Sequence, residues 1–143
     1  MFTMKITALK KIYNPKEPIF LDYSFEKLAQ FIITPRDNKE KIEFPAWSPA
    51  TFTGDKLTND NVVEISCAVF DIDEGLEWEV HNHFKDYQYI AHTSFSHCDT
   101  KHKWRLVIPF TTPVPSHLWE GAWMQCKRFF FEMTGKPMDE KCK

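Results

Sequence analysis

The sequence lacks any apolar run close to the roughly 20 residues that a membrane-spanning helix needs. Its first residues, MFTMKITALKKIY, contain no apolar segment of the kind found in signal peptides. The four cysteines are widely separated and form no CxxC pair, which argues against a disulfide scaffold and favours reduced thiols. We therefore expect a cytoplasmic protein that does not interact with a membrane.

An excess of charge of one sign is also missing, because the formal net charge is only −2. Proteins that hold nucleic acid by bulk charge are usually basic, so any nucleic-acid site here must be local. What the chain does have is 143 residues, 43% of them hydrophobic, which is enough for one soluble domain with a real core. Most of the 13 phenylalanines are expected in that core.

The first half of the chain gives a few local signals. Met4–Tyr13 alternates loosely and predicts a strand. Phe25–Ile32 has helical spacing of its apolar residues, with Ser24 as its N-cap. Pro45–Gly54 is rich in proline and predicts a loop. We expect residues 1–45 to form an extension that packs on a core made by residues 46–143.

The second half is more regular and predicts an α+β fold. In order we expect a strand at Val62–Asp73, a short helix at Glu77–Asp86, strands at Tyr87–Ser94 and Trp104–Phe110, a rigid connection at Pro113–Pro115, and a helix at Leu118–Met133 capped by Ser116 and ended by Gly135. One further strand after this helix would complete a ferredoxin-like βαββαβ unit. The sequence ends at Lys143, where that strand should begin, so we expect a core truncated at its last strand or completed from elsewhere.

Two carboxylates, Asp71 and Asp73, stand at the end of the apolar run VFDID. Residues two apart in a strand point to the same face, so these side chains should project together. Neighbouring carboxylates repel unless a cation lies between them, and oxygen ligands suit Mg²⁺ or Mn²⁺. Such pairs can hold the metals of phosphoryl transfer. The plain alternative is a solvated strand end followed by the turn at Gly75.

The segment that follows the next strand carries several cationic side chains: His97, Lys101, His102, Lys103 and Arg105. Cationic donors beside a carboxylate–metal centre can bind the phosphates of a nucleotide. A charged residue within a strand, such as Arg105, indicates a solvated face or a site. The alternative is a basic surface hairpin.

Two other metal interpretations have less support. Zinc held by His97, Cys98 and His102 would need a fourth ligand, and no second pair has suitable spacing. His81 and His83 form an HxH, but residues two apart do not share a helix face, so we expect surface histidines.

The order of these motifs resembles the archaeo-eukaryotic primase superfamily, specifically the primase-polymerase domains of phage and plasmid replication proteins. The resemblance covers about residues 47–143. It rests on an apolar strand ending in Val69–Asp73, then TSxSH at Thr93–His97, then the strand at Trp104–Phe110 and a late Met138-Asp139.

This resemblance implies a nucleotidyltransferase that adds nucleoside triphosphates to a 3′-hydroxyl on a single-stranded DNA template or primer. Asp71, Asp73 and Asp139 would hold Mg²⁺ or Mn²⁺. The histidine that contacts phosphates in this family is either His97, after Ser96, or His102. It also implies a cytoplasmic location in a bacterial or phage-infected cell, and a helicase region in a longer parent.

The remaining nucleotide-binding candidates implied by the resemblance are Ser96, Lys101, Lys103 and Arg105. Trp47 and Trp104 could stack on bases, with core packing as the alternative. A competing hypothesis is a non-catalytic ferredoxin-like module that binds single-stranded nucleic acid or a replication partner. A rolling-circle initiator would need a nucleophilic tyrosine near an HxH, but no tyrosine follows Tyr89.

Overall fold

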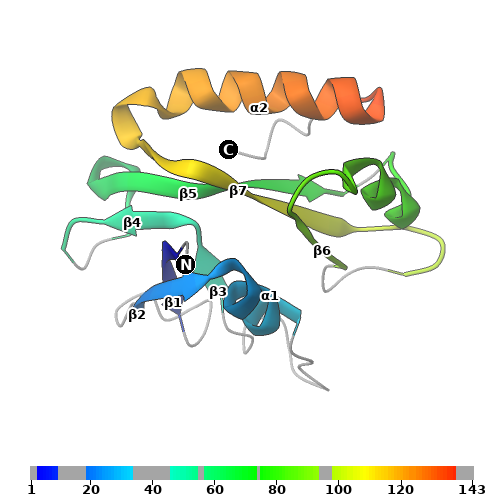
Figure 1. Ribbon diagram of the computed structural model, residues 1–143. Coiled ribbons are helices and arrows are strands. Elements are labelled where there is room, and N and C mark those ends of the chain that lie inside the picture. The colour runs from blue at the N-terminus through cyan, green and yellow to red at the C-terminus, as the bar shows by residue number, and fades with distance from the viewer. Residues whose placement is uncertain are drawn as a thin grey trace. The chain divides into compact units, whose positions relative to one another are not determined.

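The computed structural model describes residues 3–9, 19–33, 46–54, 57–73, 75–93 and 98–137. It confirms a mixed α+β chain with antiparallel strand pairs (Figure 1). Its contacts divide the chain into two compact units, residues 1–66 with 111–117 and residues 67–110 with 118–143. Within the described residues, no helix is both long and apolar enough to cross a membrane.

The first unit contains a three-stranded sheet in the order β2-β1-β3, formed by β1 (Thr3–Leu9), β2 (Ile19–Ser24) and β3 (Ala46–Ser48). Both pairs of strands are antiparallel. Helix α1 (Phe25–Ile33) follows β2 directly, and its Lys27 N–H donates to the Ser24 hydroxyl over 3.2 Å. The predicted N-cap is therefore confirmed, whereas strand β2 was not anticipated.

The segment Pro45–Gly54 is not a loop, contrary to the sequence prediction. It contains β3 and the short strand β4 (Ala50–Phe52), which pairs with the start of β5 (Val62–Ile72). The Thr7 hydroxyl donates to the Ala50 carbonyl over 2.8 Å. Segments distant in sequence thus supply the hydrogen-bond partners of this backbone, and the local proline content does not reveal them.

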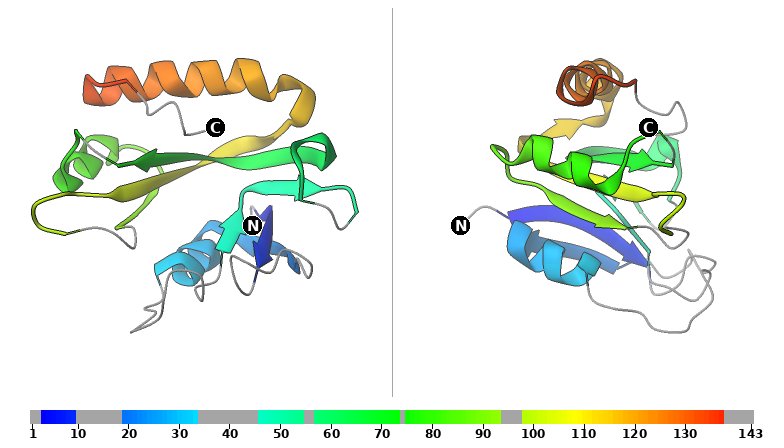
Figure 2. Two further views of the ribbon diagram at one scale, coloured as in Figure 1. Left: turned by 180° about the vertical axis from the view of Figure 1, so that it is seen from behind. Right: turned by 90° about the vertical axis from the view of Figure 1, so that its right-hand side faces the viewer.

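The second unit is built on the middle of a sheet ordered β4-β5-β7-β6, with β6 (Ile90–Thr93) antiparallel to β7 (Trp104–Pro115). A 3-10 helix, η3 (Trp78–Phe84), lies between β5 and β6 in sequence. The turn η4 (Ser116–Leu118) leads into α2 (Trp119–Thr134), which runs along one face of β5 and β7 (Figures 1 and 2).

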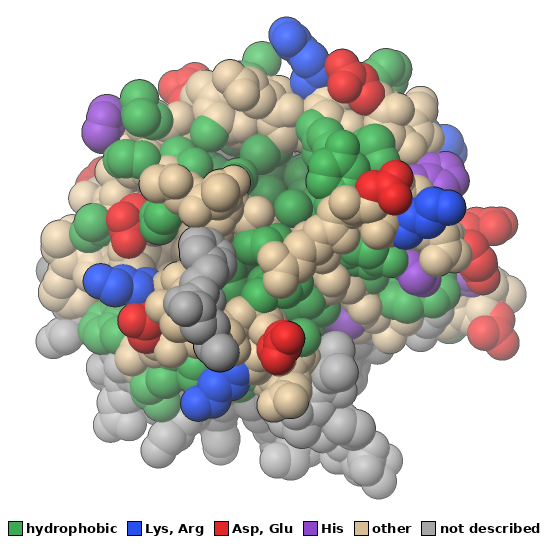
Figure 3. Space-filling model, in the orientation of Figure 1, with side chains coloured by type: hydrophobic (Ala, Val, Ile, Leu, Met, Phe, Trp, Pro, Cys, Tyr) green, Lys and Arg blue, Asp and Glu red, His purple; other side chains and the backbone are tan. Residues whose placement is uncertain are grey.

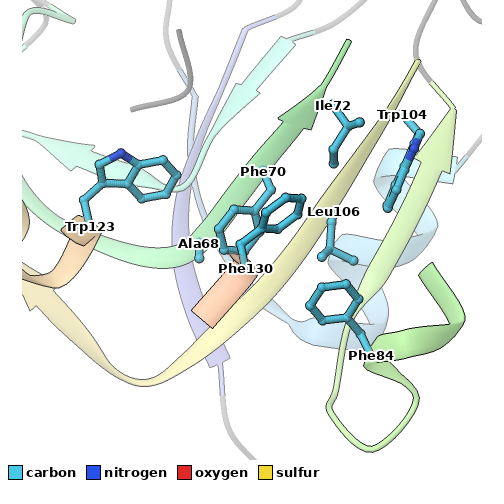
Figure 4. Close-up of a cluster of buried hydrophobic side chains, with 8 residues drawn as sticks. All are labelled: Ala68, Phe70, Ile72, Phe84, Trp104, Leu106, Trp123 and Phe130. Carbon is cyan, nitrogen blue, oxygen red and sulfur yellow. The ribbon is translucent and has the colours of Figure 1, made fainter. Parts of the chain in front are cut away.

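Alternate residues of the central strands build the core of this unit beneath α2 (Figure 4). Phe70 of β5 stacks on Phe130 of α2 with ring centroids 5.1 Å apart. The other buried members of this cluster are Ala68, Ile72, Phe84, Trp104, Leu106 and Trp123. Figure 3 shows hydrophobic side chains gathered below α2 in the same region. Phe84 of η3 is fully buried in this core.

The segment from Pro109 to the start of α2 departs from prediction at three places. Strand β7 continues through Pro109 to Pro115, so Pro113–Pro115 is strand and not a separate rigid connection. The prolines at 109, 113 and 115 all have odd numbers, so the strand loses backbone donors on one side only. Ser116 opens the turn η4, and Leu118 occupies the N-cap of α2 without a side-chain hydrogen bond.

Candidate functional site

The face of the sheet opposite α2 carries the predicted acidic residues. Phe70 and Ile72 of β5 are buried in the core beneath α2, so Asp71 between them projects from the other face. Asp73 lies one residue beyond the end of the strand. The side chain of Asp71 keeps 41% of its surface exposed, and Asp73 is partly exposed. Both carboxylates are therefore accessible to an ion or a ligand.

Arg105 of β7 lies on this same face, because its neighbours Trp104 and Leu106 are buried in the core. Its Nη2 donates to Oδ2 of Asp71 over 3.4 Å, and 35% of its side chain is exposed. A single long contact at this exposure contributes at most about 1 kcal/mol to stability. The structure thus brings together two of the residues that the sequence singled out.

His92 of β6 completes the arrangement, and the sequence analysis did not identify it. It lies directly opposite Arg105 in the antiparallel register of β6 and β7, which places the two side chains next to each other. Asp71, Arg105 and His92 thus form a row across three neighbouring strands, β5, β7 and β6. We call it the Asp71–Arg105–His92 row.

The tautomer of His92 follows from its contacts. Its Nδ1 lies 3.2 Å from the Thr93 carbonyl, so Nδ1 carries the proton and donates. Nε2 then keeps a lone pair, and this buried atom has no hydrogen-bond partner among the described residues. The Nε atom of Arg105 is likewise buried and without a partner in the described part of the chain.

Burial lowers the pKa of His92 below its ordinary value of 6.5, and the charge of Arg105 adds to this effect. The contact with the Thr93 carbonyl and the charge of Asp71 oppose it. The net direction keeps His92 neutral near physiological pH. The row therefore contains one anion, one cation and one neutral acceptor.

His102 lies beside the start of η3. The backbone N–H of Trp78, at the start of η3, donates to Nδ1 of His102 over 3.0 Å. Lys103 is partly buried, whereas Lys101 is exposed in a tight turn where its backbone pairs with Cys98. The candidates Ser96, His97 and Asp139 lie outside the described residues.

Two further predictions need correction. His81 is not a surface histidine, because it is partly buried and its Nδ1 lies 2.9 Å from the Tyr89 hydroxyl. His83 is exposed, with Nδ1 3.0 Å from the Met133 carbonyl. Trp104 is fully buried and its Nε1 donates to the Leu76 carbonyl, so it packs in the core and cannot stack on a base.

The donor set at the end of β5 fits a hard divalent cation. Asp71 and Asp73 supply accessible carboxylate oxygens, which are the ligands that Mg²⁺ and Mn²⁺ prefer. In the described ranges, no group of three or more His, Cys, Asp or Glu side chains gathers in a way that could hold a metal. Asp71 and Asp73 would therefore hold such a cation together with further oxygen ligands, such as water.

Comparison with known proteins gives no family for this chain. No family model matches it, and neither a curated protein nor a solved structure does.

Proposed function

We propose that the chain is a nucleotidyltransferase domain of the primase-polymerase type, which adds nucleoside triphosphates to a nucleic-acid 3′-hydroxyl. The observation that carries this proposal is the Asp71–Arg105–His92 row, which starts at the acidic end of β5 beside Asp73. It sets metal-binding oxygens next to a guanidinium suited to phosphate. These are the two kinds of group that triphosphate chemistry requires.

The order of elements supports a ferredoxin-like core. Strands β5, β7 and β6 are neighbours in that order, η3 joins β5 to β6, and α2 follows β7. Both η3 and α2 contribute to the same core cluster, through Phe84 and through Trp123 and Phe130. This order is the one expected of a βαββα unit, with the 3-10 helix η3 in the place of its first helix, and it supports the proposed ferredoxin-like core.

In the proposed reaction, bound Mg²⁺ or Mn²⁺ would neutralise the triphosphate and stabilise in-line attack. Asp71 and Asp73 would hold the ion through their carboxylate oxygens, and Asp139 is proposed as a third ligand. Arg105 directs its donors toward the phosphates, and the neutral His92 beside it orients the guanidinium. His97 or His102, with Ser96, Lys101 and Lys103, stay as proposed phosphate contacts.

A contact at the end of α2 supports the part proposed for Asp139. Nζ of Lys136 donates to the carbonyl of Gly75, two residues after Asp73. The Lys136 side chain, just beyond α2, is therefore next to the acidic end of β5. Asp139 follows three residues later, within about 10 Å of chain length.

The composition of the site's face favours catalysis over the competing binding module. Ferredoxin-like domains that bind single strands by stacking use aromatic side chains on the open sheet face. In the described part of the second unit, this face carries Val69, Asp71, Ile90, His92, Arg105 and Val107, while the aromatic residues of these strands lie in the core beneath α2. Acidic and basic groups suit a metal and phosphates better than they suit base stacking.

The test is nucleotide addition to a primer on single-stranded DNA by the full chain, with Mn²⁺ or Mg²⁺ and each class of nucleoside triphosphate. Asp71→Ala with Asp73→Ala should abolish extension. Asp60→Ala with Asp86→Ala removes two exposed carboxylates elsewhere and should leave it unchanged. Equal extension by both double variants would refute the proposal. Binding of single strands that persists in a chelator, without extension, would instead identify the binding module.

A further inference from the structure

We propose that Arg105 is an exchangeable counter-ion, which holds Asp71 in the free protein and moves to His92 when a divalent cation binds. This inference rests on the cation site of the proposed function and adds an order of events to it. The Arg105 guanidinium would pair with the Asp71 carboxylate before the ion binds. It would face His92 once the ion is bound.

The position of Arg105 allows both pairings. Strand β7 lies between β5 and β6, so a side chain on its site-bearing face has Asp71 on one side and His92 on the other. The guanidinium carries five N–H donors on a long flexible stem. A change of side-chain rotamer is therefore enough to carry it from one strand to the next without backbone movement.

The present pairing with Asp71 is easily replaced. It consists of one contact of 3.4 Å from Nη2, and not of the short bidentate contact that makes arginine–carboxylate pairs strong. More than a third of the Asp71 side chain is exposed, at 41%. A divalent cation, with twice the charge and direct access to the oxygens, can displace this contact.

His92 provides a nitrogen that can accept a hydrogen bond from Arg105. Its Nδ1 proton is directed to the Thr93 carbonyl, and the lone pair of the buried Nε2 atom has no partner among the described residues. Arg105 has the complementary deficit, because its buried Nε–H has no acceptor in the part of the chain that the structure describes. Unpaired buried polar atoms are costly and uncommon in native proteins. A hydrogen bond from Arg105 to His92 would give Nε2 of His92 a donor and would give an N–H group of Arg105 an acceptor.

The exchange predicts coupling between metal and nucleotide. Because Arg105 and the cation compete for Asp71, the free protein binds cations more weakly than the carboxylates alone would. A triphosphate that attracts Arg105 away from Asp71 would strengthen cation binding, and by linkage the cation would strengthen triphosphate binding equally.

The decisive measurement is Mn²⁺ titration of the full chain without nucleotide, with free Mn²⁺ followed by electron paramagnetic resonance. Arg105→Gln should bind Mn²⁺ roughly fivefold more tightly than the wild type, since a partly exposed competing pair is removed. Arg128→Gln removes the same charge from an exposed position on α2 and should change the affinity less than twofold. His92→Leu, which lacks the second acceptor, should bind Mn²⁺ more weakly than the wild type.

A second measurement follows Arg105 itself. In ¹⁵N-labelled protein titrated with diamagnetic Mg²⁺, the Nε–H resonance of Arg105 should shift in the wild type and shift much less in His92→Leu. Thermal unfolding of each variant identifies any that fails to fold. The shift of the Arg105 resonance in the wild type tests the exchange even if a variant fails.

The outcomes separate this inference from the proposed function. If Asp71→Asn abolishes Mn²⁺ binding while Arg105→Gln binds like the wild type, the exchange is wrong and the metal site stands. An equal gain in Arg128→Gln would also overturn it, because the effect would be one of net charge. If neither the wild type nor Arg105→Gln binds Mn²⁺, the cation site fails, and both proposals fail with it.

Discussion

Arg105 on β7 donates to Asp71 on β5 over 3.4 Å, and both side chains are more than a third exposed, at 35% and 41%. The pair joins two adjacent strands on the face of the sheet opposite α2. Exposed ion pairs of this kind contribute little to folding. Two opposite charges at a strand end, with little structural benefit, are better explained by a ligand that uses both.

The first prediction separates the chemical role of Asp71 from its structural one. Asp71→Asn keeps the shape of the side chain but removes the charge that would hold a cation. Nucleotide addition should fall by about 100-fold or more, because charge stabilisation of the transferring phosphate is lost. The free energy of unfolding in urea should change by less than about 1 kcal/mol. A loss of several kcal/mol would instead make Asp71 a structural residue.

His92 gives a prediction about pH. Its pKa in the folded chain lies below the ordinary value of 6.5, chiefly because of burial. The unfolded chain therefore binds more protons than the folded one between these two values, and stability falls as pH drops through 6.5 toward the folded pKa. His92→Gln removes this contribution.

Urea denaturation near pH 7, 6 and 5 measures the effect. The wild type should lose more stability on acidification than His92→Gln does, and the difference between the two chains isolates His92 from the other five histidines. Parallel curves for the two chains would mean that His92 titrates alike in the folded and unfolded states.

Much of the fold could be predicted where the signal is local. The apolar run of β5 and the cap of α1 at Ser24 depend on residues near in sequence, and both appear in the structure. Gly135, in the left-handed conformation with φ 76°, ends α2 as expected. Strands β3 and β4 escaped prediction because each is only three residues long and takes its partners from distant segments.

The residues of the site also divide into those that a local sequence signal predicts and those that depend on strand pairing. Asp71 was recognisable because carboxylates at the end of an apolar strand are unusual. His92 was not, because it gains its place from the β6–β7 register, which sets it opposite a residue 13 positions away. The available signal was the period-two alternation of Tyr87–Ser94, which puts His92 on the same face as the buried Ile90. A histidine on a buried strand face deserves comparison with any charged residue on the next strand.

Trp104 allows a test of core packing against base stacking. Trp104→Phe removes volume from a fully buried site and leaves the Leu76 carbonyl without its donor. The free energy of unfolding should fall by about 2–3 kcal/mol. Trp47→Phe, at a partly exposed position, should cost less than about 1 kcal/mol. Chemical denaturation followed by fluorescence of the remaining tryptophans measures both, and equal small losses would contradict the packing argument.

Two glycines near the ends of α2 make opposite predictions. Gly135 has φ 76°, where a β-carbon is strained, so Gly135→Ala should destabilise the chain by about 1 kcal/mol. Gly121 is helical, and a β-carbon there would meet no atom within 4 Å. Gly121→Ala should therefore stabilise the chain by up to about 1 kcal/mol. Thermal unfolding of the two variants should shift in opposite directions, and a shift of the same sign would contradict this account.

Lys136 provides a test of how the end of α2 serves the acidic site. Its Nζ donates to the Gly75 carbonyl, at an exposed position where the loss of one hydrogen bond should hardly affect stability. If this contact directs the following chain toward Asp71 and Asp73, Lys136→Met should weaken Mn²⁺ binding by about tenfold, as loss of a supporting contact does in metal sites. Lys136→Arg, which keeps a donor, should recover most of the affinity. Lys85→Met, at another exposed lysine, provides the control for charge.

A double variant tests whether Lys136 acts through Asp139. Asp139→Asn should weaken Mn²⁺ binding in the wild type and add little in Lys136→Met, because both changes act through the same ligand. Independent, fully additive losses would show that Lys136 does not position Asp139.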